Sequence, residues 1–417
     1  MNMNRILFVT VFSVVFLLLD YYAFQAIKTL TVNQSEGFQK GVKTLYFALT
    51  SLVIIAILVY NFGHPDGIAK HARTALMSFV FINVLAKLML GFFVFIDDIQ
   101  RVARWVVMKL SNPSTTGSEK GISRSKFLAT TGLVVAAAPI VSLSWGIISG
   151  AHDYRVRRIK LPVKGLPKAL EGLRIGQLSD IHSGSFWNKT AVKGGVQMLQ
   201  DEKVDLAFFT GDLVNNKATE MQEWGSIFAK VNAPLGVYSV FGNHDYGDYV
   251  EWESQAKKQK NLADLATIHK NMGWNLLINE HKIIKVDGEK LGVIGVENWG
   301  AKARFPKYGK LDVATQNLPE TSVNMLLSHD PSHWQAEVLP KYDNIDLTLS
   351  GHTHGMQFGV DIPGFKWSPV QYVYDEWAGL YKSKDQYLYV NRGYGYIGYP
   401  GRVGILPEIS VIILERA

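Results

Sequence analysis

The sequence predicts an all-α transmembrane module of four helices followed by an α/β domain. Three observations lead to this fold class. Four long apolar runs fill the first 150 residues, short apolar strands alternate with amphipathic segments after Ala151, and polar motifs end several of those strands. A length of 417 residues is enough for about two domains. We therefore expect a membrane module over 1–150 and a second domain over 151–417.

Each apolar run is near the ~20 residues that a helix needs to cross a bilayer. One such run alone is also compatible with a buried core helix or a signal peptide, but four in succession, separated by polar loops, favour membrane helices. The lipid bilayer is then a partner of the chain, which we expect to be a multi-pass protein of the cell membrane. The runs are Ile6 to Ala23, Leu45 to Phe62, Ala75 to Ile96 and Phe127 to Ile148.

Two ionisable residues, Asp20 and Lys87, lie within the first and third runs. At about 1.5 Å rise per residue, they reach comparable depth in helices that run in the same direction. A lone charge at that depth is costly, so we predict that they pair. The alternative is that each reaches the membrane surface or lines a polar contact.

The basic residues of the membrane module are concentrated in the first and third loops. The positive-inside rule places these loops in the cytoplasm and the C-terminal domain outside it. A basic group just after the fourth run, Arg155 to Lys160, weakens this bias. The loop residues are Lys28, Lys40, Lys43, Arg101, Arg104, Lys109, Lys120, Arg124 and Lys126.

Composition excludes several functions. The chain has no cysteine, so it has no disulfide, no thiolate metal site and no cysteine nucleophile. Its net charge is +7, and the basic residues form no long stripe. We therefore expect no nucleic-acid partner.

The second domain has strand and helix patterns in alternation at its start and a strand-rich later half. Asn188 is a candidate cap for a helix that runs through Gln200, and Glu251 to Met272 has a helical pattern. This order predicts α/β units first and more antiparallel pairing later. The predicted strands are Arg174 to Leu178, Val204 to Phe209, Val237 to Phe241, Val323 to Leu327, Ile345 to Leu349, Tyr387 to Val390 and Ile409 to Leu414.

Five polar motifs follow apolar runs in this domain. Open α/β sheets present the carboxyl ends of their strands to one crevice, so motifs far apart in the chain can converge there. They supply carboxylates, imidazoles and one amide, a ligand set for two divalent metal ions. The motifs are Asp180-Ile181-His182, Gly211-Asp212, Gly242-Asn243-His244-Asp245, Ser328-His329-Asp330 and Gly351-His352-Thr353-His354.

In this order and spacing, the five motifs resemble those of the calcineurin-like metallophosphoesterases, from about Leu173 to the C-terminus. The resemblance implies two packed, mixed β-sheets flanked by helices and the activity of a metal-dependent phosphoric ester hydrolase. It also implies that one metal is held by Asp180, His182 and His354, the other by Asn243, His329 and His352, with Asp212 between them and His244 facing the scissile phosphate.

The chemistry of these residue types agrees with the resemblance. Two metals neutralise the phosphate and lower the pKa of a bridging water, so that a metal-bridging hydroxide attacks without a covalent enzyme intermediate. His244 can donate to a phosphate oxygen or protonate the leaving group. Asp245 and Asp330 are candidates for orienting His244 and a ligand histidine, or else ordinary turn residues. The ligands suit manganese, which we favour, and also iron, zinc or cobalt.

Between Met356 and Arg402 the chain is rich in aromatic residues, with Arg392 and Arg402 among them. These residues form either a wall that packs an apolar group or a nucleobase while the arginines clamp a phosphate, or strand cores and Gly-Pro loops. Asn391-Arg392-Gly393 with Pro407-Glu408-Ile409 resembles a bacterial membrane-associated subfamily that includes UDP-2,3-diacylglucosamine pyrophosphatase-like enzymes. The aromatic residues are Phe358, Phe365, Trp367, Tyr372, Tyr374, Trp377, Tyr381, Tyr394, Tyr396 and Tyr399.

The first hypothesis for function is hydrolysis of a phosphodiester or pyrophosphate bond in a lipid or cell-envelope substrate, because a membrane module directly precedes the domain. A broad or cyclic-nucleotide phosphodiesterase is the alternative within the same chemistry. A non-catalytic metal-binding scaffold or sensor in the membrane is the alternative of another class. The complete ligand set and His244 speak against that last hypothesis.

Overall fold

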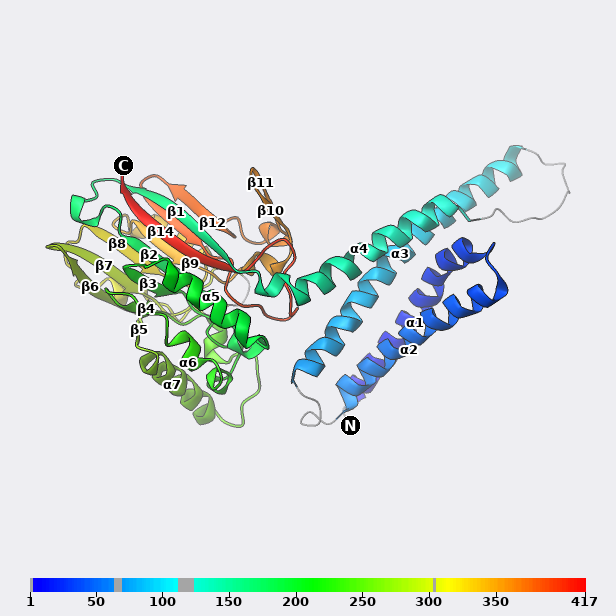
Figure 1. Cartoon of the computed structure of the whole chain (residues 1–417), viewed down its shortest axis with the longest axis horizontal. Helices are drawn as coiled ribbons and strands as arrows, with labels where there is room; N and C mark the ends of the chain where they lie inside the picture. The colour runs from blue at the N-terminus through cyan, green and yellow to red at the C-terminus, as the bar shows by residue number, and fades with distance from the viewer. Residues whose placement is uncertain (1–2, 64–69, 112–123, 303–304) are drawn as a thin grey trace. The chain divides into compact units, whose positions relative to one another are not determined.

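The computed structural model describes residues 3–63, 70–111, 124–302 and 305–417. The chain divides into two compact units, Met1–Trp145 and Gly146–Ala417 (Figure 1). Each unit has its own buried hydrophobic clusters.

The described residues of the first unit form four helices that are long and apolar enough to cross a membrane, as predicted. They are α1 (Met3–Thr31), α2 (Glu36–Phe62), α3 (Lys70–Ser111) and α4 (Lys126–Ile148), the last of which extends into the second unit. Helix α3 continues well past the predicted run, so Arg101, Arg104 and Lys109 lie on a helix and not in a loop. Lys120, from the predicted third loop, lies outside the described residues.

Asp20 and Lys87 form a buried ion pair, which confirms the predicted pairing. Thr50 of α2 joins the pair, because Lys87 donates to its Oγ1 at 3.0 Å and this hydroxyl donates to Asp20 Oδ2 at 2.7 Å. The Lys87 ammonium also lies 4.8 Å from the ring centroid of Phe16 and 4.7 Å from that of Tyr46. One polar cluster thus joins three apolar helices, and each of its charges has a partner.

The second unit contains two six-stranded mixed sheets and a separate two-stranded one, which confirms the predicted fold class (Figure 1). The first sheet has the order β1-β14-β2-β3-β4-β5, antiparallel between β14 and β2 and otherwise parallel. Its strands are β1 (Arg155–Val163), β14 (Glu408–Arg416), β2 (Arg174–Leu178), β3 (Leu206–Phe209), β4 (Val237–Ser239) and β5 (Trp274–Leu276).

The second sheet has the order β12-β13-β9-β8-β7-β6, with antiparallel pairs at both edges and parallel pairs between. Its strands are β12 (Gly379–Ser383), β13 (Gln386–Val390), β9 (Leu347–Ser350), β8 (Val323–Leu327), β7 (Glu289–Gly295) and β6 (Glu280–Val286). The two-stranded sheet pairs β10 (Val360–Ile362) with β11 (Phe365–Trp367).

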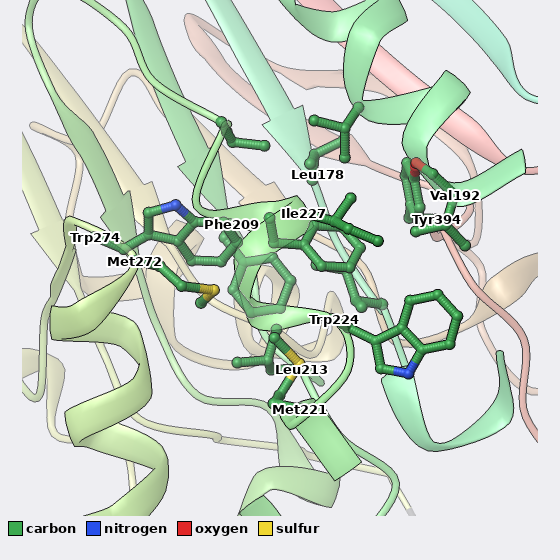
Figure 2. Packing of buried hydrophobic residues seen from close by; sticks show 14 of the residues in the cluster. Leu178, Val192, Phe209, Leu213, Met221, Trp224, Ile227, Met272, Trp274 and Tyr394 are labelled. Carbon is green, nitrogen blue, oxygen red and sulfur yellow. The ribbon is translucent and has the colours of Figure 1, made fainter. Parts of the chain in front are cut away.

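The two large sheets pack face to face through one apolar cluster, to which Phe208 of β3 and Met325 of β8 both belong. The next residue of β3, Phe209, belongs to a different cluster on the opposite face of the first sheet. That cluster also contains Trp224 and Trp274 (Figure 2). Both faces of β3 are therefore buried, as expected for a continuous apolar run in a parallel strand.

Three helices lie in the segments between the strands of the first sheet: α5 (Lys189–Asp201), α6 (Gly225–Phe228) and α7 (Gln255–Asn271). Asn188 caps α5, since its side chain accepts the N–H of Ala191 at 3.1 Å, which confirms the predicted cap. Helix α7 begins later than predicted, after its cap Ser254. The second sheet is accompanied by the short helices α8 (Leu311–Ala314) and α9 (Leu339–Lys341).

The ion pair of the membrane module yields a stability prediction. Replacing one partner, as in Lys87→Met or Asp20→Asn, leaves the other polar group without its counterpart and should cost about 3 kcal/mol. The double variant removes both groups and should regain most of that loss. The thermal midpoint of the detergent-solubilised full chain measures the effect.

The exposed pair Lys260–Asp264 on α7 serves as the control, and its removal should change stability by less than about 0.5 kcal/mol. If the two single losses add in the Asp20/Lys87 double variant, the residues are not energetically coupled.

Candidate active site

The predicted site residues follow the carboxyl ends of five parallel strands, three in the first sheet and two in the second. Such ends meet at one edge of an α/β sheet, and here two packed sheets share that edge. The placements are Asp180 and His182 after β2, Asp212 after β3, Asn243 and His244 after β4, His329 after β8, and His352 and His354 after β9.

Five of these residues adopt left-handed backbone conformations. Their φ angles are 52° at Asp180, 48° at His182, 62° at Asp212, 71° at His352 and 51° at His354. Non-glycine residues rarely adopt this conformation, and each instance costs of order 1 kcal/mol. Strain concentrated at strand ends indicates that the tight turns are kept to aim these side chains at a common point.

Two groups of three side chains each bring ligand atoms within 4.8 Å of one another. In the first group, His354 Nε2 lies 3.0 Å from His182 Nε2 and 3.2 Å from Asp180 Oδ1. The second group contains Asp212, His329 and His352. Carboxylate and imidazole donors, without thiolate, form a set that borderline divalent ions accept.

Asp212 connects the two groups. Its Oδ2 lies 3.1 Å from His329 Nε2 and 3.5 Å from His182 Nε2, which belong to different groups. Asn243 adds an amide to the second group, because its Oδ1 lies 2.9 Å from His352 Nδ1. Asp212 thus occupies the position that a bridging carboxylate needs.

Two histidines are held with their Nε2 atoms toward the centre. His329 Nδ1 contacts the Thr210 carbonyl at 2.7 Å, and His182 Nδ1 contacts Asn215 Oδ1 at 3.1 Å. An Nδ1–H that donates to oxygen leaves the Nε2 lone pair free to bind a metal. The Nε2 of His329 is buried and has no hydrogen-bond partner among the described residues. The residues present therefore fit two divalent ions.

The charge of Asp212 dominates the electrostatics of this centre. Burial alone would lower the pKa of His329, but the Asp212 carboxylate raises it to about 10. Burial would likewise raise the pKa of Asp212, yet His329 and His244 hold it well below its usual range. The fold thus keeps a buried carboxylate ionised, as a metal ligand requires.

His244, like the ligand candidate His352, is only partly buried, whereas His182, His329 and His354 are buried. Its backbone N–H donates to Asp212 Oδ1 at 2.8 Å, and its Nδ1 lies 2.9 Å from the carbonyl oxygen of Asn215. Its ring centroid lies 5.0 Å from that of His182 and 4.5 Å from that of Tyr249. It lies next to both groups without belonging to either.

Asp245 connects the loops that follow β3 and β4. Its carboxylate accepts the N–H groups of Asp212, Leu213, Val214 and Gly242 at 2.8 to 3.3 Å. Burial, followed by the charge of Asp212, raises the pKa of Asp245 to about 7. A role in orienting His244 stays a prediction.

Asp330 lies beside the other metal group. It accepts the N–H of Ser332 at 2.9 Å, and its Oδ2 lies 3.3 Å from the Tyr374 hydroxyl and 3.6 Å from His352 Nε2. Tyr374 itself contacts His352 Nε2 at 3.0 Å. Both residues are therefore placed to orient His352, and that role also stays a prediction.

Arg392 and Arg402, the candidate substrate-binding residues, are buried among protein partners. Arg392 pairs with Glu408 at 2.6 Å and Asp361 at 3.0 Å. Arg402 donates to the Gly395 carbonyl at 2.6 Å and lies 3.1 Å from His354 Nδ1. Substrate binding by either would require leaving these contacts, and it stays a prediction.

Sequence reasoning missed Asn215 and Tyr249, which touch the centre, and it named Tyr374 only as one of the residues of the aromatic-rich stretch. Asn215 contacts both His182 and His244, and the Tyr249 hydroxyl accepts the Asn243 amide at 2.8 Å. The run Gly211-Asp212-Leu213-Val214-Asn215 carried a signal for Asn215, since it sits in the same strand-end loop as Asp212. Tyr249 and Tyr374 had none beyond their aromatic character.

Each of the two units matches a known protein family. Residues 4–151 match the family described as "Probable Calcineurin-like phosphoesterase, transmembrane domain", and residues 173–356 match "Calcineurin-like phosphoesterase". The chain belongs to the calcineurin-like metallophosphoesterases and is a membrane-associated enzyme of that family that uses divalent metals.

Among its relatives, a transmembrane protein with metallophosphoesterase domain from Danio rerio is 28% identical over 82% of this chain and 74% of the relative. The uncharacterized metallophosphoesterase YkuE of Bacillus subtilis is 28% identical over 71% of this chain and 99% of its own length. UDP-2,3-diacylglucosamine pyrophosphatase LpxG of Chlamydia trachomatis is 26% identical over 63% of this chain and 89% of its own length.

The contacts of Asp245 predict that it stabilises the site through the backbone. Asp245→Ala leaves four buried N–H groups without an acceptor and should cost about 3 kcal/mol or more. For a domain of this size, that corresponds to a thermal midpoint lower by roughly 6–12 °C. The bound metal per chain should fall as well, because the Asp212 loop is no longer held.

Asp264→Ala, an exposed carboxylate on α7, is the control and should leave the midpoint and the metal content unchanged. An Asp245→Ala protein with a normal midpoint would show that the backbone contacts do not matter.

Proposed function

We propose that this membrane enzyme hydrolyses a phosphodiester or pyrophosphate bond in a lipid or cell-envelope substrate. One observation carries the proposal: Asp212 lies between two groups of candidate ligands, with the half-buried His244 beside them. A dimetal centre with a partly exposed imidazole beside it, outside the ligand set, is an arrangement that suits phosphoester hydrolysis.

In this proposal, Asp180, His182 and His354 would hold one ion, Asn243, His329 and His352 would hold the other, and Asp212 lies between the two groups. Two bound divalent ions supply positive charge to the phosphate and lower the pKa of coordinated water. Asp180 and Asp212 are the carboxylates in this set, and the imidazoles and the amide add no charge. The ligands therefore supply fewer negative charges than two divalent ions supply positive ones. Two divalent ions therefore keep a net positive charge, which favours an anionic phosphate. Manganese is the metal we propose.

His244 is the proposed proton donor. Hydrolysis forms a bond between phosphorus and a water oxygen and breaks the bond between phosphorus and the leaving oxygen, which needs a proton. Because Nδ1 of His244 faces the Asn215 carbonyl, Nε2 is the atom left to exchange a proton with the substrate.

The substrate class rests on two supports. The four candidate membrane helices keep the enzyme at a bilayer. One relative, which this chain matches over 89% of the relative's own length, is named a UDP-2,3-diacylglucosamine pyrophosphatase. The substrate in that name is an acylated molecule with a pyrophosphate bond. Together they favour a phosphoester whose apolar part resides in the membrane over a freely diffusing cyclic nucleotide.

The proposal is tested with the full chain in detergent and manganese, on bis(p-nitrophenyl) phosphate and p-nitrophenyl phosphate. We expect diester turnover. His244→Ala should lower kcat by about 10²-fold or more with both metals retained. Asp212→Ala should lose turnover and metal together. His281→Ala is the matched control, since this histidine lies on β6 and contacts the Ala314 carbonyl.

Full activity in His244→Ala would overturn its role as proton donor. Two bound metals without turnover of either ester would favour a scaffold or sensor. No metal and no turnover in the wild-type chain would overturn the dimetal centre itself.

The absence of cysteine allows a direct test of orientation, which we propose to be extracytoplasmic for the catalytic unit. Lys164→Cys places a thiol where the wild-type side chain is 78% exposed, and Asn33→Cys places one in the loop between α1 and α2. A membrane-impermeant maleimide should label position 164 in intact cells and position 33 only after permeabilisation. The reverse pattern would place the catalytic unit in the cytoplasm.

A further inference from the structure

The aromatic-rich stretch contains an exposed apolar surface that the catalytic centre does not use. In the described part from Ala151 onward, thirteen large hydrophobic side chains are exposed, and eight of them lie between Met356 and Leu380. Residues 356–380, here called the apolar segment, thus hold most of the exposed apolar surface of the catalytic unit. A patch of this kind normally marks an interaction surface.

The β10–β11 hairpin projects the most apolar part of this segment. Its turn, Ile362-Pro363-Gly364-Phe365, is exposed at all four positions, and Gly364 has a φ of 80°. Proline followed by a glycine of positive φ is the pattern of a type II turn. Hairpin turns are usually polar, but Ile362 is 59% exposed and Phe365 is 55% exposed. We call these four residues the tip.

The base of the hairpin is held firmly. Asp361 of β10 pairs with Arg157 and with Arg392. Ser368, just after β11, donates to the Gly355 carbonyl at 2.8 Å. Within the segment, Tyr374 and Trp377 are buried and belong to one small apolar cluster with Val370, Ala378 and Ile405. The tip is therefore presented on a fixed support.

The same segment adjoins the metal ligands. Met356, 54% exposed, comes two residues after His354. Tyr374 contacts His352 Nε2 at 3.0 Å, and Thr353, between the two ligand histidines, donates to the Trp377 carbonyl at 2.7 Å. Whatever covers the apolar segment is thereby brought close to the reacting centre.

The end of the last candidate membrane span lies close to the apolar segment, which indicates that the bilayer is what covers this segment. The last candidate membrane span ends at His152, and Gly146 within it is the first residue of the catalytic unit. The Gly146 carbonyl accepts the Arg402 N–H at 3.1 Å. A side chain at Gly150 would meet the Arg402 carbonyl at 2.0 Å, so glycine permits this close approach. The next residue, Val403, exchanges backbone hydrogen bonds with Gln357 and Gly359 at the start of the segment, at 2.8 and 2.9 Å.

We propose that the apolar segment is a membrane-contacting surface whose tip enters the lipid interface. Three-residue strands reach roughly 10 Å, comparable with the roughly 5–10 Å depth at which interfacial segments lie. Phe, Tyr, Ile and Met side chains suit that region. The tip is small for a protein partner, since a stable interface needs roughly 20–30 residues a side. The bilayer is therefore the occupant.

The consequence for the reaction rests on the proposed function. A centre seated at the headgroup layer reaches phosphoesters whose acyl or isoprenoid chains remain in the bilayer. The substrate class is then an intact membrane lipid with a phosphodiester or pyrophosphate headgroup, taken without extraction from the membrane.

Membrane contact is measured without turnover. A single cysteine at Phe365→Cys carries an environment-sensitive fluorophore, in the full chain reconstituted into phosphatidylcholine and phosphatidylglycerol vesicles with nitroxide-labelled lipid. We expect at least twofold quenching. Lys164→Cys is the control and should be unquenched, because it lies beyond the end of β1 opposite to Arg157, the hairpin's partner. Equal quenching at positions 365 and 164 would overturn the proposal. So would a fluorophore at position 365 that is shielded by a second copy of the chain and is not quenched by the labelled lipid.

Turnover supplies the second readout. Ile362→Ser/Phe365→Ser should lower hydrolysis of hexadecyl p-nitrophenyl phosphate in vesicles at least tenfold and leave that of soluble bis(p-nitrophenyl) phosphate unchanged. Ile278→Ser/Val313→Ser changes two exposed apolar residues elsewhere and should affect neither substrate. Equal rates on vesicles for the two double variants overturn the membrane-contacting surface. Quenching of the labelled Phe365→Cys chain, together with a wild-type chain that cleaves neither ester, overturns the proposed function instead.

Discussion

The buried carboxylate of Asp212 is the constraint around which the catalytic unit is arranged. A buried charge requires polar partners, and here they are His182, which follows β2 of the first sheet, and His329, which follows β8 of the second. The backbone N–H of His244 adds a further donor. Both sheets must therefore end at the same place, which makes their face-to-face packing a requirement of the site as well as of the core. Bound divalent ions would satisfy the same charge more completely than imidazoles do.

The strand ends could be predicted because they depend on local sequence. Strands β2 and β8 were predicted with their observed bounds, since each is a short run that stops at a polar motif. Nearly all of their residues are buried, although Gln177 and Asn324 are polar. The ligand candidates were found for the same reason, because each lies two to five residues beyond such a run. Asn188 as a cap and the Asp20–Lys87 pair followed from equally local chemistry.

The elements that were missed depend on tertiary contacts. Strand β1 has exposed and half-buried positions along most of its length, so its sequence lacks an apolar run, and its pairing with β14 joins residues about 250 positions apart. Arg392 and Arg402 looked like phosphate ligands because a guanidinium suits that role. That role stays a prediction, and the fold buries both residues against Glu408 and backbone carbonyls. Which partner a long charged side chain takes is decided by packing, and no local pattern carries that information.

The aromatic-rich stretch shows how one composition serves two physical purposes. Tyr394 and Tyr396 are buried in the first sheet's cluster, so the core interpretation holds for them. Phe358, Phe365 and Tyr372 are exposed, and for them burial must come from outside the unit. A soluble domain gains nothing from such exposure, but a domain tied to a bilayer by apolar helices has an apolar medium within reach. The same tether therefore accounts for the exposed surface and favours a substrate that stays in the membrane.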